Sequence, residues 1–119
     1  MSKSNTMFLQ LQVHWEGCLV DMLHVVNRFP KSQRFIWGQR ISNLVVDIAE
    51  DILEARFSPK GAHKKLLVEK IDKNMSKLSM LFRLSHEMKY VSTGQLELIA
   101  KNIYEAGKMV GGWKKSIQQ

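Results

Sequence analysis

Four long segments with helical spacing of apolar residues, separated by short breaks, constrain the fold of this chain most. Between about residues 5 and 28, apolar side chains recur every three or four positions, which matches one face of an α-helix. These positions are Phe8, Leu11, Trp15, Cys18, Leu19, Met22 and Val26. Strict alternation of polar and apolar residues and the Asn-Gly hairpin signal are both missing from the sequence, so strands are not expected.

Three further helices are expected at about residues 31–57, 59–90 and 93–117. Pro30 should end the first helix, because the residue before a proline avoids the α conformation. Ser58 is the expected N-cap of the third helix, and Ser92 with Gln95 matches a capping box for the fourth. Long helices joined by short connections must lie antiparallel. The sequence therefore predicts an all-α protein, an antiparallel up-down-up-down four-helix bundle formed by a single domain, residues 1–119.

Composition narrows the class of protein. The 45% of hydrophobic residues argues against disorder. No apolar run reaches the roughly 18 residues of a transmembrane helix, and the start of the chain lacks a secretory h-region with a cleavage site. A single cysteine, Cys18, excludes an internal disulfide and a cysteine-rich metal site. We therefore expect a cytoplasmic protein with no membrane association and no cofactor.

Metal-dependent catalysis is the main enzymatic alternative for a helical bundle. Di-iron bundles need Glu-x-x-His pairs, and none of the four histidines belongs to one. Asp47, Asp51 and Glu54 share one side of the second helix, a pattern that more often marks a solvated or lysine-paired face than a metal site. We expect neither a metal site nor an enzyme; stoichiometric iron or manganese in the purified protein would contradict this.

The basic residues suggest a polyanionic partner. The net charge is +7, and its excess is concentrated rather than spread. In the second helix the cations precede the acidic residues, an order that opposes the helix dipole. Because this order reduces the stability of the helix, it suggests that the cations have a functional role. A solvated face is the alternative. The candidate phosphate or acidic-surface contacts are Arg28, Lys31, Arg34 and Arg40 at the first turn, then Lys70, Lys73 and Lys77 on one sector of the third helix, then Lys114 and Lys115.

Apolar positions outside the core stripes suggest an oligomer. Exposed apolar faces commonly mark subunit interfaces, although a broad core face would give a similar pattern. The second helix carries Phe35, Val46, Ala49 and Leu53, and the third carries Leu66, Met80 and Leu84.

The last helix has an unusual end. Ala100, Gly107 and Gly111 share one side, where small residues would let a neighbouring backbone approach. Trp113, followed by two lysines, is either an amphipathic end-clasp or a contact for another subunit or partner, and we count it among the candidate residues of the oligomer interface.

Three stretches resemble the accessory variability protein (Avd) of diversity-generating retroelements. They are "NRFPKSQRFIWGQRI" (27–41), "RLSHEMKYVS" (83–92) and "AGKMVGGWKKS" (106–116), and the similarity spans about residues 20–117. "FPK" and "IAE" (48–50) are also similar to four-helix bundle proteins encoded in ribosomal RNA intervening sequences. In those proteins a glycine tends to follow Ile-Ala-Glu, and Asp51 stands there instead, which favours the retroelement family.

The resemblance implies a four-helix bundle that assembles into a homopentameric barrel with a basic surface. It also implies a non-enzymatic role: binding the element's reverse transcriptase, and nucleic acid, during mutagenic copying of template RNA into cDNA. The alternative is a stand-alone oligomeric bundle of the intervening-sequence type, which binds nucleic acid without a transcriptase partner.

Overall fold

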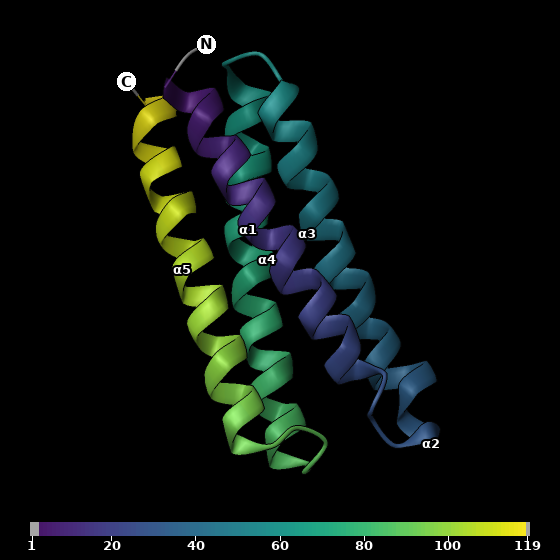
Figure 1. Ribbon diagram of the computed structural model, residues 1–119. Helices are drawn as coiled ribbons and strands as arrows, with labels where there is room; N and C mark the ends of the chain where they lie inside the picture. Colours follow the sequence, from purple (N-terminus) through teal and green to yellow (C-terminus); the bar gives the residue numbers. More distant parts are fainter. Residues whose placement is uncertain (1–2, 119) are drawn as a thin grey trace.

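Four long helices make up the computed structural model, which describes residues 3–118 (Figure 1). They are α1 (Lys3–Val26), α3 (Gln39–Phe57), α4 (Ala62–Glu87) and α5 (Thr93–Gln118). A single turn, α2 (Lys31–Gln33), and a short π-helical segment, η1 (Arg34–Gly38), precede α3. No strand occurs in this part of the chain. The prediction of an all-α four-helix bundle is confirmed.

The helices pack as a closed ring of neighbours. α1 contacts α3 and α5, and α4 contacts the same two helices, so each long helix lies at one corner of a square. Both termini and the α3–α4 connection lie at one end of the molecule, and the α1–α3 turn and the α4–α5 connection lie at the other (Figure 1). We call this second end, residues 27–40 and 88–92, the turn end. The bundle measures 45 × 23 × 19 Å.

The core follows the periodicity of the sequence. Trp15, Ile48, Ile71 and Val110 are fully buried, one from each long helix. Burial of apolar area at about 25 cal/mol per Å² is the main term that holds such a bundle together. The indole N–H of Trp15 donates to the carbonyl oxygen of Val45 at 3.1 Å, so even this polar atom is satisfied inside the core.

The predicted capping box at α5 is confirmed. The Ser92 hydroxyl accepts from the Gln95 amide at 3.1 Å, and the Gln95 side chain accepts from the Ser92 amide at 2.9 Å. The predicted N-cap at Ser58 is wrong. Ser58 instead ends α3, where its hydroxyl donates to the carbonyl oxygen of Glu54 at 2.8 Å, and α4 begins three residues after Pro59.

The expected single helix over residues 31–57 begins with a π-helical turn. Gly38 closes this turn against the end of α1, since a Cβ there would lie 2.9 Å from Cγ1 of Val26. Any larger residue at this position would require the Val26 side chain to move. π-Helical turns are rare and occur often at functional sites.

Candidate nucleic-acid and partner interface

The turn end is fixed by contacts from three elements. Phe29 is buried and lies against the ring of Tyr90, with centroids 5.6 Å apart. The indole of Trp37 donates to the Ser85 hydroxyl at 2.7 Å, and that hydroxyl donates to the Leu81 carbonyl oxygen at 2.7 Å. These contacts join the α1–α3 turn to the end of α4 and to the connection that follows it.

Four predicted cations lie on this turn and are exposed: Arg28, Lys31, Arg34 and Arg40. Residues 22–46 contain no aspartate or glutamate. Within the described chain, Arg28, Lys31 and Arg40 form no ion pair, and Arg34 donates its Nε–H to the Phe29 carbonyl oxygen at 3.2 Å. The turn end is therefore a basic surface whose charges are not neutralised by the protein itself.

Lys89 adds a cation that the sequence reasoning missed. It adopts a left-handed conformation with φ 65° directly after α4, and its neighbour Tyr90 packs on Phe29. The Tyr90 amide donates to the Ser85 carbonyl oxygen at 2.8 Å, as in a Schellman motif. Glycine is the usual residue at such a position, so nothing in the amino-acid type of Lys89 indicated this geometry.

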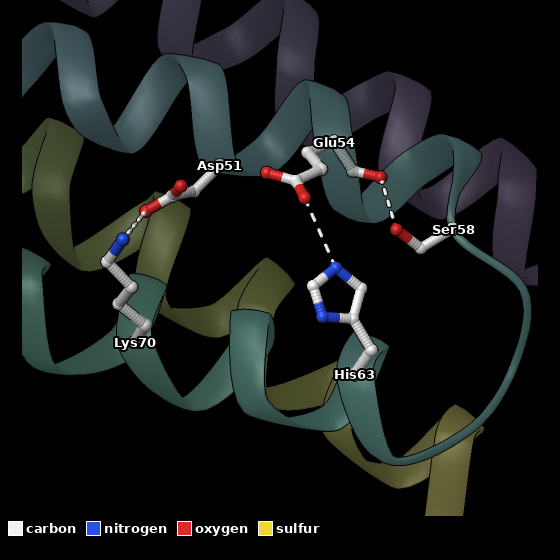
Figure 2. A network of polar contacts seen from close by, with 5 residues as sticks. All are labelled: Asp51, Glu54, Ser58, His63 and Lys70. Atoms are coloured by element: carbon white, nitrogen blue, oxygen red, sulfur yellow. Dashed lines mark hydrogen bonds and ion pairs between the residues drawn. The ribbon is translucent and has the colours of Figure 1, made fainter.

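Of the three predicted cations on α4, Lys70, Lys73 and Lys77, one forms an ion pair within the protein. Lys70 Nζ lies 3.3 Å from Oδ2 of Asp51, a buried carboxylate on α3, while the lysine side chain itself is 60% exposed (Figure 2). The contact compensates the carboxylate charge without the geometry of a hydrogen bond. Nearby, His63 Nε2 lies 3.2 Å from Glu54 Oε1.

These contacts agree with the expectation that the acidic side of the predicted helix 31–57, which is α3 in the structure, is paired with neighbouring cations. Lys73 and Lys77 are exposed and form no ion pair in the described part of the chain.

Of the two C-terminal lysines, one forms an ion pair within the described part of the protein and the other does not. Lys114 binds Asp72 of α4 at 2.7 Å, whereas Lys115 is exposed. Lys115 continues a row with Lys101 and Lys108 at intervals of seven residues on the outer side of α5. Lys108 lies 4.8 Å above the ring of Tyr104. The heptad spacing was visible in the sequence and could have identified Lys101 and Lys108.

The apolar residues predicted to form an interface are mostly exposed. Phe35 is 78% exposed, and Val46, Leu53, Leu66, Met80 and Leu84 are also exposed, while Ala49 is half-buried. Trp113 corrects the prediction. It is 1% exposed and packs edge-on against Phe8 inside one chain, so it offers no surface to a second subunit.

The buried reactive groups are structural. Burial, together with the charges of Asp21 and Glu105, raises the pKa of the Cys18 thiol to about 11, so the thiol stays protonated and is a poor nucleophile. Burial and the charge of Lys60 lower the pKa of Lys64, whose Nζ donates to the Ser58 carbonyl oxygen at 3.3 Å. Among the described residues, no three His, Cys, Asp or Glu side chains come together in a group able to hold a metal ion.

Comparison with known families decides the classification. A model of the bAvd-like family matches residues 10–117. The chain belongs to the bAvd-like family. This confirms the resemblance to the accessory variability proteins and identifies the chain as an Avd-type accessory protein. Neither the curated proteins nor the solved structures contain a match. In the described part of this bAvd-like chain, no helix is long and apolar enough to cross a membrane.

Proposed function

We propose that this protein is a non-enzymatic accessory protein of a diversity-generating retroelement, acting in the cytoplasm as a homo-oligomer, a pentamer in the family's pattern. It binds the element's reverse transcriptase and the template RNA or its cDNA copy, and so supports mutagenic reverse transcription. The observation that carries the proposal is the family match over residues 10–117.

The turn end supports nucleic-acid binding. Its cations are exposed, free of acidic neighbours along residues 22–46, and joined by Lys89 from the α4–α5 connection. Each phosphate that such cations neutralise releases counterions and adds to binding without reading sequence. Lys70 and Lys114, by contrast, are held by Asp51 and Asp72, so we place them outside the main contact.

Charge reversal tests the placement. Replacing Arg28→Glu together with Lys31→Glu should weaken binding of a labelled single-stranded RNA at least tenfold, measured by fluorescence anisotropy. Loss of two phosphate contacts should reduce the slope of log affinity against log salt by about 1.4. The matched control, Lys60→Glu with Lys65→Glu, makes the same charge change at the opposite end of the bundle and should have a much smaller effect. Equal losses in both variants would show that binding follows net charge alone.

Co-purification with the reverse transcriptase of the same element tests the partner. Stable retention of the transcriptase on the immobilised oligomer, and loss of mutagenic cDNA when the protein is omitted, are the expected results. RNA binding without any retention of the transcriptase would instead favour the stand-alone bundle of the intervening-sequence type. Detection of neither partner would contradict the proposal.

A further inference from the structure

An exposed row of side chains on α4 has the spacing of a coiled-coil contact. Steps of four and three residues keep a row straight along a helix surface, as in the seam between supercoiled helices. Leu66, Met80 and Leu84 are 63%, 42% and 38% exposed, so the row does not belong to the core of its own bundle. The row, called the α4 seam below, consists of Leu66, Lys70, Lys73, Lys77, Met80 and Leu84. It is apolar at both ends and basic in the middle.

Two rows with the same spacing, but with glutamate in place of lysine, lie on α1 and α3. Val13 is 63% exposed, and Leu53 and Phe57 are 45% and 68% exposed. The α1 row consists of Leu9, Val13, Glu16 and Val20, and the α3 row of Val46, Glu50, Leu53 and Phe57. Each row therefore carries one acidic residue among exposed apolar ones.

The α1 and α3 rows border one groove. The two helices are tied together where Arg56 donates to the Gln12 side chain at 3.2 Å and where Trp15 donates to Val45. Between them lies an open groove of about 300 Å³. Glu16 and Glu50 line it with apolar neighbours; the full lining is Gln12, Trp15, Glu16, Ala49, Glu50, Ile52 and Leu53. We call this groove with its two rows the α1–α3 groove.

The α4 seam and the α1–α3 groove lie on adjacent sides of the square bundle. The α3 residues that reach α4, Asp51 and Glu54, precede or follow Leu53 by one or two positions and so point away from the α1–α3 groove. The two surfaces therefore meet at roughly a right angle around α3. Neither surface suits a copy of itself, because seam against seam would oppose lysines and groove against groove would oppose glutamates.

We propose that the α4 seam of one copy of this chain seats in the α1–α3 groove of the next copy, in a head-to-tail interface that repeats around a ring. Leu66, Met80 and Leu84 bury against the apolar rows, and Lys73 and Lys77 face Glu16 and Glu50 of the neighbour. A helix laid into an apolar groove is a common recognition mode. Unlike surfaces on adjacent sides of a subunit make heterologous contacts, and such contacts form a closed ring when the rotation from copy to copy closes. The inference rests on the proposed oligomeric state and assigns its surfaces.

Mixing two disabled variants tests the head-to-tail arrangement. Val13→Asp with Leu53→Asp disables the groove, and Leu66→Asp with Met80→Asp disables the seam; all four side chains are exposed, so the fold should survive, which circular dichroism checks. Each variant alone should be monomeric by light scattering. Mixed in equal amounts they should form a one-to-one dimer and nothing larger, because each supplies one intact surface.

The controls separate this inference from the proposed function. Leu98→Asp changes a 55% exposed leucine of α5 outside both surfaces and should leave the ring intact. A full-size oligomer from either disabled variant, or a mixture that stays monomeric, would overturn the head-to-tail interface. A wild-type protein that is monomeric but still retains the transcriptase and RNA would overturn this inference while leaving those partners in place.

Discussion

Lys89 is the one described residue other than glycine with a positive φ, at 65°. A side chain in the left-handed conformation costs roughly 1 kcal/mol or more, and such positions tend to be retained where function needs them. Lys89 follows Met88, the C-cap of α4, and lies at the turn end with the cations of the α1–α3 turn. At the scale of single residues, this protein therefore keeps a charge where local stability favours glycine.

Replacing Lys89→Gly should separate stability from binding. The free energy of unfolding should rise by about 0.5–1 kcal/mol, because glycine relieves the strain of the positive φ. RNA binding should weaken several-fold, because one cation of the turn end is lost. Urea unfolding and fluorescence anisotropy measure the two effects. Lys89→Ala removes the charge without relieving the strain, so it should weaken binding with no gain in stability; a gain equal to that of the glycine variant would contradict the assigned cause.

Trp113 shows where single residues escape prediction. Its place after Gly111 and Gly112 and before two lysines suggested a contact with another molecule. The periodicity of α5 could equally have placed it in the core, with Val110 and Ile117 on the same side, and the structure shows the core position. Sequence patterns set the face of a helix well, but they do not tell whether an aromatic residue near a helix end is covered by a neighbour such as Phe8.

The glycines of α5 show the same limit at the scale of an element. Gly107 and Gly111 share one side of the helix, as the spacing indicated, yet a Cβ at either position would meet no atom within 4 Å. The expected close approach of a neighbouring backbone is therefore wrong for these two within one chain. Of the three glycines, Gly112 is the one that lies close to another side chain, since a Cβ there would be 3.1 Å from Cε of Met7.

Alanine substitutions along α5 should reflect this difference. Gly107→Ala and Gly111→Ala should each stabilise the protein by about 0.5–1 kcal/mol, because alanine favours the helix interior and nothing obstructs the added methyl group. Gly112→Ala should gain less, since the Met7 side chain must move. Thermal unfolding of the three variants measures the order. Destabilisation by Gly107→Ala or Gly111→Ala would show that these glycines meet a neighbouring subunit instead of open space.

The long helices and their core faces could be predicted because their apolar period extends over at least about four turns in each. The connections could not be predicted as well. Ser58 and Pro59 satisfy the rules for a helix start, but the hydrogen bond from Ser58 to the Glu54 carbonyl oxygen makes the serine an end of α3 instead. The π-helical turn was not predicted either. Its last residue, Gly38, lies against Val26 of α1, and a contact between residues of different helices leaves no local signal in the sequence.

Charge divides the molecule into a basic turn end and a groove that carries Glu16 and Glu50, and this division could be predicted only in part. The basic turn end followed from the sequence, whereas the ion pairs of Lys70 and Lys114 depend on how α4 meets α3 and α5. Glu16 and Glu50 lie in the α1–α3 groove, far along the helices from the turn end. At the scale of the whole molecule, the proposed ring and the proposed nucleic-acid surface therefore use different residues and different physical forces.

Salt should separate these two activities. Raising the ionic strength tenfold should weaken RNA binding by about 10²–10³-fold if four phosphates are neutralised at the turn end, because counterion release dominates that contact. The oligomer should dissociate little, because its interface is held mainly by buried apolar side chains, whose contribution salt does not screen. Analytical ultracentrifugation and anisotropy across the same salt series measure both. If assembly and RNA binding were lost together, with the same slope, the lysines of the α4 seam would be shared between the two, and the separation of the surfaces would be wrong.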